Sequence, residues 1–413
     1  MRNVSNDPLG QIEILEEIKS GKTKRIRKTS NPKYVAFESK GMDITASGAG
    51  TEENAGKVQN ELVQNSIMFG LLNGLGFATS YAGTKGNHLI HKMGMPFNQE
   101  VVVCFGVCAR ATLVSRYPWL YGEKDGQGNH SQVQPSTKYV GLDKKVHPFK
   151  EPVIQLFHKK CVIVKPDGEL DLVSESSVKN DPRYFDGATK EPTKFTYDDP
   201  LLMQSRDDAN VWELHDRLRR QDISKPICYI DRKDGILFKM RDGGGRQMIG
   251  TSRLAPADYM SPEQERAARL MVLRALTAIK IACSKTKFPK TRMVGGKAEV
   301  IPGEFYDGAL VIDGKLELML DDDGNILITD DLLNTNMRWA FEGKSNMTAK
   351  GLYQNADKKD QNNLVALTIA EGIKGWNNPE FIAEVKRELE KVFPVDKVAK
   401  FPGVAQPYEK QRS

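Results

Sequence analysis

The chain contains the segment Ile312-Asp313-Gly314-Lys315-Leu316-Glu317-Leu318 and, after a short linker, the segment Ile326-Leu327-Ile328-Thr329-Asp330-Asp331. Both segments are predicted to form strands. Side chains alternate between the two faces of a strand, so Asp313, Lys315 and Glu317 would point one way and their apolar neighbours the other. The first segment therefore presents charges of both signs on one face.

A hairpin is predicted between the two segments. Their linker, Asp321-Asp322-Asp323-Gly324-Asn325, contains Asp-Gly, a strong signal for a tight turn. With Asp323 and Gly324 as the two turn residues, Glu317 would lie directly opposite Asp330. Facing like charges destabilise a hairpin unless a cation lies between them, and carboxylate oxygens are ligands that Mg²⁺ takes. The alternative is a solvated acidic hairpin, and this stretch alone favours neither interpretation.

Composition sets broad limits on the fold and on the partners. A chain of 413 residues with 39% hydrophobic and 28% charged residues is expected to hold one large or two ordinary domains. The sequence shows no apolar run of membrane-spanning length and no signal-peptide pattern, and its five cysteines include no Cys-x-x-Cys pair. We therefore expect a cytoplasmic protein with reduced thiols. A net charge of +6 suits an anionic ligand but does not imply nucleic acid.

The order of expected elements is typical of an α+β fold. Residues 12–39 are predicted to be β structure, residues 55–74 a helix ended by Gly74-Leu75-Gly76, and residues 88–93 and 100–103 strands. The sequence from about 119 to 258 is irregular and is interpreted as an insertion. A capping box at Ser261-Pro262-Glu263-Gln264 predicts a helix start, and Asn378-Pro379-Glu380 predicts another.

The segment Gly21-Lys22-Thr23-Lys24-Arg25 carries a candidate phosphate-binding turn. It is not a P-loop, because Glu16 stands where the first glycine of that motif is required. A glycine turn between two strands could instead place backbone amides and both lysines over a phosphate chain. Taken alone, the segment is better explained as a solvated edge strand, in which lysines discourage aggregation.

Several segments, taken in order along the chain, resemble the SAICAR synthetases (phosphoribosylaminoimidazole-succinocarboxamide synthases). The hairpin from Asp313 to Asp331 is the most specific of them. The supporting segments are Gly21-Lys22-Thr23-Lys24, Asp43-Ile44-Thr45-Ala46, Gly56-Lys57, Glu100-Val101-Val102-Val103, Thr112 to Pro118, the helix capped at Ser261, and Arg338-Trp339. The resemblance covers about residues 20–118 and 260–390.

The resemblance implies a two-lobed SAICAR synthase-like fold and an ATP- and Mg²⁺-dependent ligase. Such enzymes transfer the γ-phosphate of ATP to a carboxylate, and the amino group of aspartate then displaces the phosphate to form an amide. By similarity, Lys22 and Lys24 with Gly21 would hold phosphates, and Lys92 and Met93 would lie against adenine. The remaining implied roles are Mg²⁺ binding for Glu317 and Asp330, charge neutralisation for Lys315, and the acceptor site for Asp43.

The acceptor half departs from the family pattern. The family carries an arginine that, with a following Gly-Ser pair, binds the ribotide phosphate. In the aligned stretch from Cys104 to Thr112 no arginine stands at the expected place, alanine replaces the glycine, and threonine replaces the serine. Arg110 would have to supply the missing charge, and Arg338 is a further candidate for the acceptor phosphate. Of the long insertion, only Asp199-Pro200 resembles a family landmark, preceded by aspartate where the family has histidine. The acceptor-binding residues expected from the resemblance are Arg110, Thr112, Arg338 and Asp199.

Three functions remain open. The leading one joins a carboxylated aminoimidazole ribotide to aspartate. The second keeps the ATP-driven ligation but uses another amino acid or another acceptor, such as a modified base, a nucleotide or a polynucleotide. The third is a non-catalytic nucleic-acid-binding protein that uses Lys19–Lys28 and the insertion. We expect a nucleotide lobe at 1–97, a second lobe at 98–345 including insertion 119–258, C-terminal helices at 346–413 packing on the second lobe, and a homo-oligomer without a membrane partner.

Overall fold

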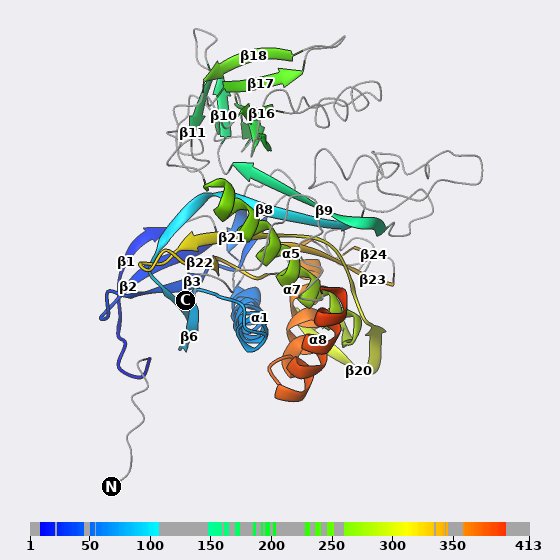
Figure 1. The fold of residues 1–413 in the computed structure, drawn as a ribbon. Helices are drawn as coiled ribbons and strands as arrows, with labels where there is room; N and C mark the ends of the chain where they lie inside the picture. The colour runs from blue at the N-terminus through cyan, green and yellow to red at the C-terminus, as the bar shows by residue number, and fades with distance from the viewer. Residues whose placement is uncertain are drawn as a thin grey trace, which may run out of the picture. The chain divides into compact units, whose positions relative to one another are not determined.

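A computed structural model provides the fold (Figure 1). It describes residues 9–20, 23–44, 50–53, 55–106, 148–158, 161–164, 170–173, 185–186, 191–192, 195–198, 201–203, 228–231, 236–240, 246–251, 260–333, 336–342, 344–345 and 358–393. The chain divides into two compact units. The first contains residues 1–96, 274–311 and 318–398, and the second contains residues 97–273, 312–317 and 399–413.

The first unit begins with a five-stranded antiparallel sheet in the order β1-β2-β3-β7-β6. Its register places Lys24 beside Ser39 and Val35 beside His91. This sheet is the β structure that the sequence predicts for residues 12–39 and 88–93. The strands are β1 (Ile14–Ser20), β2 (Lys24–Thr29), β3 (Tyr34–Ser39), β6 (Tyr81–Lys85) and β7 (His88–Lys92), and a separate pair is formed by β4 (Met42–Ile44) and β5 (Gly50–Glu53).

Helix α1 (Ala55–Gly74) packs against β3, β6 and β7 of this sheet (Figure 1). It buries an apolar face that includes Phe69 and Leu72. At its C-terminus Gly76 has φ +86°, the Gly76 amide donates to the Asn73 carbonyl, and the Phe77 amide donates to the Leu72 carbonyl. This pair of bonds is a Schellman motif, which needs a left-handed residue that glycine adopts without strain. The predicted helix and its glycine end are thus confirmed.

The rest of the first unit packs around a cluster of buried aromatic side chains. Phe288, Trp339 and Phe341 meet edge to face, and Trp376 stacks on Trp339 while its Nε1 donates to Thr286 Oγ1 at 2.8 Å. The elements are α5 (Pro262–Ser284, from Arg274 on), β19 (Lys287–Val294), β20 (Lys297–Asp307), β22 (Ile326–Thr329), β23 (Met337–Phe341), β24 (Lys344–Ser345), α7 (Lys358–Gly372), η4 (Ile373–Gly375) and α8 (Pro379–Val392).

The second unit is built on strands β8 (Met95–Gly106) and β9 (Pro148–His158), which pair antiparallel. Its main sheet runs β18-β17-β16-β15-β9-β8-β21, and β21 (Leu310–Leu320) contributes residues 312–317 to this unit. Strands β15 and β16 pair in parallel. The other strands are β15 (Leu201–Met203), β16 (Cys228–Asp231), β17 (Ile236–Met240) and β18 (Arg246–Thr251), with β10 (Cys161–Val164), β11 (Leu170–Val173), β12 (Phe185–Asp186), β13 (Glu191–Pro192) and β14 (Phe195–Asp198) in two smaller sheets.

Both predicted helix starts are confirmed. The Ser261 amide donates to Gln264 Oε1 at 2.8 Å, and the Gln264 amide donates to Ser261 Oγ at 3.2 Å, which completes the capping box of α5. The Asn378 side chain accepts a hydrogen bond from the Glu380 amide at the start of α8. The α+β class is likewise confirmed by this mixture of antiparallel sheets and helices.

The units differ from the expected domains after residue 97. Strands β19, β20 and β22 and the C-terminal helices belong to the first unit, although the sequence suggested that the helices pack on the second lobe. The reason lies in long-range contacts: α7 packs on α1 as well as on β19, and Gln64 Nε2 of α1 donates to the Ala366 carbonyl of α7. The region 119–258 also holds more strands than its irregular sequence suggests, because all of its strands except the eleven-residue β9 are only two to six residues long.

The hairpin between β21 and β22 forms, but its predicted turn is wrong by one residue. The Asp321 amide donates to the Asn325 carbonyl and the Gly324 amide to the Asp321 carbonyl, so three residues form the loop. Gly324 has φ +79°, and the Asp321 carboxylate accepts from the Asp323 and Asn325 amides. These bonds stabilise a turn that ends in a left-handed glycine. The register that placed Glu317 directly opposite Asp330 is therefore also off by one residue.

A search of the helices in the described part of the chain finds none with the length and apolar character needed to cross a membrane.

Candidate functional site

The first unit brings a predicted phosphate-binding lysine onto a predicted metal ligand. Lys24, at the start of β2, forms an ion pair with Asp330, which follows β22, and a second with Asp331 at 3.0 Å. The exposed fractions of the three side chains are 13%, 22% and 13%, so solvent screens these charges only in part. One ammonium group therefore serves two adjacent carboxylates, and the three charges sum to −1.

The backbone around Asp330 explains why both carboxylates reach the same cation. Asp330 has φ +69°, a left-handed conformation that is uncommon for a residue other than glycine. Asn65 of α1 accepts a hydrogen bond from the Leu332 amide at 2.6 Å and directs its amide nitrogen at Asp331 Oδ1 at 3.5 Å. Asn336 Nδ2 donates to the Asp331 carbonyl at 2.6 Å. These side chains hold the Asp330 turn from both sides.

An aromatic stack lies against the Lys24 ammonium. The Phe37 ring centroid is 4.8 Å from Lys24 Nζ, and Phe37 stacks on His91 at 4.5 Å. His91 Nδ1 is 2.8 Å from Ser80 Oγ, and Ser80 Oγ donates to Thr329 Oγ1 at 2.9 Å. Burial, together with the nearby Lys24 charge, lowers the pKa of His91 to about 3. His91 is thus neutral near pH 7 and adds no positive charge beside Lys24.

Helix α1 carries a buried polar stripe at helical spacing. Lys57, Glu61 and Asn65 are four residues apart, and all three are buried. Lys57 Nζ lies 3.2 Å from Glu61 Oε1, and Ser39 Oγ donates to the other Glu61 oxygen. Burial raises the pKa of Glu61, and the nearby Asp331 raises it further, while Lys57 and Ser39 oppose the shift. The stripe links the end of β3 to the segment that carries Asp331.

In the second unit, Lys315 is paired with a residue that the sequence did not single out as functional. Lys315 Nζ lies 2.6 Å from Glu100 Oε2, and the side chains are 21% and 5% exposed. Lys315 comes from β21 and Glu100 from β8, two neighbouring strands of the sheet. The contact therefore joins an ammonium group to a carboxylate that is almost fully buried.

The other predicted site residues are distributed as follows. Lys92 and Met93 lie at the exposed end of β7, where the Lys92 amide donates to the Ser80 carbonyl and the Met93 amide to the Lys33 carbonyl. An adenine contact by these residues stays a prediction. Arg338 is buried on β23, Glu317 lies on β21, and Asp43 lies on β4. The predicted residues Gly21, Lys22, Arg110, Thr112 and Asp199 lie outside the described residues.

The sequence analysis missed Glu61, Asn65 and Glu100 as members of these clusters. A signal for the first two was present, because Lys57, Glu61 and Asn65 recur every four residues on a helix whose other faces carry buried apolar residues. Glu100 had no such signal, since a single carboxylate at the start of an apolar strand can as well be solvated.

The basic residues of β2 do not form a free cationic surface. Arg27 Nε donates to Glu38 Oε2 at 2.8 Å, Arg25 approaches Glu17 and Glu38 at 3.8 Å, and Lys28 Nζ lies 2.7 Å from Glu16. Phosphate recognition by nucleic-acid-binding proteins needs cations that are free to replace counterions. The pairing in β2 speaks against the nucleic-acid alternative.

No group of three or more His, Cys, Asp and Glu side chains comes together as a metal site within the described ranges. Mg²⁺ commonly needs only one or two protein carboxylates, with substrate phosphates and water completing its ligands. Asp330 and Asp331 satisfy that requirement, and the Lys24 ammonium shows that the two oxygens already share a cation. The residues present therefore fit Mg²⁺ bound together with a nucleotide.

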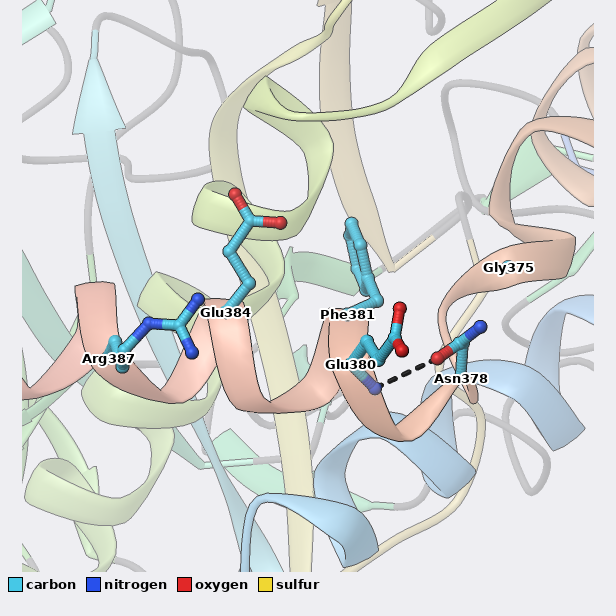
Figure 2. Close-up of a pocket in the computed structure, with 6 residues that line it drawn as sticks. All are labelled: Gly375, Asn378, Glu380, Phe381, Glu384 and Arg387. Carbon is cyan, nitrogen blue, oxygen red and sulfur yellow. Dashed lines mark hydrogen bonds between the residues drawn. The ribbon is translucent and has the colours of Figure 1, made fainter.

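A surface hollow of about 460 Å³ lies along η4 and α8 (Figure 2). Its polar lining is already used: Asn378 caps α8, as the dashed line in Figure 2 shows, and Glu384 forms a 2.6 Å ion pair with Lys285. None of the predicted site residues lines this hollow, and we assign no ligand to it. Its lining residues are Gly375, Asn378, Glu380, Phe381, Glu384 and Arg387.

The sequence matches no known family model. No curated protein matches it significantly.

Solved structures of SAICAR synthetases resemble this chain at low identity. A SAICAR synthetase (Type-2) in complex with ADP aligns with 85% of this chain and 94% of its own, at 15% identity and a TM-score of 0.43. A phosphoribosylaminoimidazole-succinocarboxamide synthase from Ehrlichia chaffeensis aligns with 91% of this chain and 97% of its own, at 12% identity and a TM-score of 0.42. The Saccharomyces cerevisiae SAICAR synthase complexed with SAICAR aligns with 91% of this chain and 93% of its own, at 10% identity and a TM-score of 0.39. At these values the similarity establishes neither the family of this chain nor its reaction.

Proposed function

We propose that the chain is an ATP-dependent carbon–nitrogen ligase of the SAICAR synthetase type. The observation that carries the proposal is the contact of Lys24 with Asp330 and Asp331, which joins segments from opposite ends of the chain. Sequence resemblance had given Lys24 to phosphate and Asp330 to Mg²⁺. A site that handles Mg²⁺ and ATP needs these two chemistries side by side.

The ion pair suggests how the empty and loaded states would differ. In the structure, Lys24 offsets one of the two negative charges of Asp330 and Asp331. With Mg²⁺ and ATP present, Lys24 would turn to phosphate oxygens, and Asp330 with Asp331 would hold the metal. Mg²⁺ would supply charge neutralisation of the phosphate oxygens. The Phe37 ring beneath Lys24 limits where the ammonium can go, so the lysine stays close to both partners.

Lys315 is the proposed positive group at the junction between ATP and the acceptor. Glu100 fixes the position of its ammonium group through the 2.6 Å ion pair. An ammonium group placed in advance stabilises charge that develops on the transferring phosphoryl group. Asp43 is proposed to line the acceptor site.

The proposed reaction has two steps. The γ-phosphoryl group of ATP moves to a carboxylate oxygen of the acceptor, which gives an acyl phosphate and ADP. An amine then attacks the acyl carbon, the carbon–nitrogen bond forms, a proton is lost from nitrogen, and inorganic phosphate leaves. The leading pair of substrates is a carboxylated aminoimidazole ribotide and aspartate. The absence of the family arginine from its expected place in the stretch Cys104–Thr112 favours the second candidate, which is the same ligation on a different carboxylate acceptor or amine.

The test is ADP release with candidate carboxylates, each supplied with and without aspartate. Release that requires both the carboxylate and Mg²⁺, and that disappears in Lys24→Met, supports the ligase. Lys28→Met is the matched control, because Lys28 lies four residues along the same strand in an exposed pair with Glu16. ADP release that is equal in both variants would overturn the assignment of Lys24. Binding of labelled single-stranded nucleic acid with no binding of ATP would favour the non-catalytic alternative.

A homo-oligomer in the cytoplasm remains part of the proposal. Sedimentation of the full chain tests the oligomeric state.

A further inference from the structure

The Asp330 turn needs a specific support, and Asn65 supplies it. Asp330 takes a left-handed backbone conformation, and the next residue shares the Lys24 ammonium. The carboxylates at 330 and 331 repel each other, so the segment has an electrostatic reason to open. Something outside the turn must hold it in place.

Asn65 contacts this segment through both ends of its side-chain amide. Its Oδ1 accepts from the Leu332 amide at 2.6 Å, and its Nδ2 lies 3.5 Å from Asp331 Oδ1. Asn65 is 1% exposed, so these contacts are shielded from water. The residue is fixed in turn by its place on α1, with Glu61 one turn before it.

We propose that Asn65 is a positioning residue for the cation site, because it fixes the Asp330–Leu332 segment so that both carboxylates face one cation. This inference rests on the proposed function for the identity of that cation. The positioning itself depends only on the two contacts of Asn65. Residues one layer behind a metal ligand set its orientation, and their loss commonly lowers metal affinity by about 10–100-fold.

The chain offers a matched control on the same helix. Gln64 is also buried, and its side chain donates to the Ala366 carbonyl of α7 at 3.0 Å. Asn65→Leu and Gln64→Leu each remove a buried amide of α1, and the first removes the two contacts with the Asp330–Leu332 segment whereas the second removes the hydrogen bond to α7. A purely structural role would give the two variants the same phenotype.

The first measurement is Mn²⁺ binding, followed by electron paramagnetic resonance, in full-length protein carrying Lys24→Met. This change removes the competing ammonium and leaves the carboxylates to the metal. We expect Asn65→Leu to weaken Mn²⁺ binding in that background by about 10–100-fold, and Gln64→Leu to leave it unchanged. Equal Mn²⁺ affinity in the Asn65→Leu and Gln64→Leu proteins would overturn the inference about Asn65 without contradicting the cation site itself.

The second measurement needs no metal. Hydrogen exchange of the Leu332 amide, followed by NMR in the protein with Lys24 intact, should speed up at least about tenfold in Asn65→Leu, since one buried hydrogen bond is lost. Asn65→Asp keeps an acceptor for that amide, so the Leu332 amide should exchange slowly in this variant, as it should in Gln64→Leu.

If the Lys24→Met protein binds no Mn²⁺, the proposed cation site fails, and the Leu332 exchange alone decides the role of Asn65. Unchanged exchange in Asn65→Leu overturns the inference.

Discussion

Lysine–carboxylate contacts occur in both units of the molecule, and they differ in the arrangement and burial of the carboxylates. In the first unit the ammonium of Lys24 faces two adjacent carboxylates, and in the second unit Lys315 pairs with Glu100. The three charges of the first cluster sum to −1 and are partly open to solvent, whereas the Glu100 carboxylate is almost fully buried. Two adjacent carboxylates with one ammonium have affinity for a further cation, and a buried pair gives a fixed position.

The largest expected effect is on ATP turnover, and it concerns the first cluster, which contains Asp330. We predict that Asp330→Asn lowers Mg²⁺-dependent ATP turnover at least about 100-fold, since removal of one group that stabilises transferring charge has effects of that size. Asparagine tolerates the left-handed conformation that Asp330 adopts, so the fold should remain. Asp322→Asn, in the exposed hairpin loop, is the control. Turnover close to that of the parent in Asp330→Asn would show that the carboxylate is a surface feature.

The Lys315–Glu100 pair should depend on its lysine for stability. Lys315→Met leaves Glu100 buried without its ammonium partner, and we predict a loss of about 3 kcal/mol in the free energy of unfolding. Added Mg²⁺ should not restore it, because the Glu100 side chain is only 5% exposed and Mg²⁺ gives up its water ligands reluctantly. Urea denaturation with and without Mg²⁺ measures both quantities. Recovery of stability by Mg²⁺ would remove the contrast between the clusters.

The first cluster should respond in the opposite way to metal. Lys24→Met exposes Asp330 and Asp331 to their mutual repulsion, and we predict a loss of about 2 kcal/mol, less than for a fully buried pair because the side chains are partly exposed. Millimolar Mg²⁺ should recover part of this loss, since a ligand that binds only the native state stabilises it. The same denaturation series with Lys28→Met should show no response to metal.

The buried histidine beside Lys24, His91, should make the free energy of unfolding depend on pH. The pKa of His91 is about 3 in the folded protein and is lowered from 6.5, so the unfolded chain binds more protons between these values. The free energy of unfolding therefore falls as pH decreases from 6.5 towards 3, by at most about 1.4 kcal/mol per pH unit from this group. His91→Gln should flatten that slope, and His88→Gln on the same strand should not. Unfolding curves at several pH values test the difference.

The smallest effect is expected at the surface of β2. Lys28→Met removes an exposed ion pair with Glu16, and such pairs contribute about 0–1 kcal/mol. We predict a change in unfolding free energy below about 0.5 kcal/mol, with ATP turnover unchanged. A large loss of ATP binding in this variant would mean that phosphate recognition extends over the whole strand and is not confined to Lys24.

Local features of the fold could be predicted because their causes are local. The span of α1 and its glycine end follow from helical periodicity and the Schellman motif, and the start of α5 follows from the Ser261–Gln264 capping box. The hairpin after β21 was predicted correctly, but its loop length was not. The carboxylate of Asp321 selects the longer loop by accepting two backbone amides, a detail that the Asp-Gly signal does not contain.

The sequence by itself determined the α+β class, the span of α1, the starts of α5 and α8, and the mixed charges of the hairpin strands, because each depends on neighbouring residues. Only the tertiary structure decided that Lys24 meets Asp330 and Asp331, that Glu100 holds Lys315, and that the C-terminal helices return to the first unit. These contacts join residues hundreds of positions apart. They are set by how whole helices and sheets pack, which leaves no periodic pattern in the sequence from which the partners could be identified.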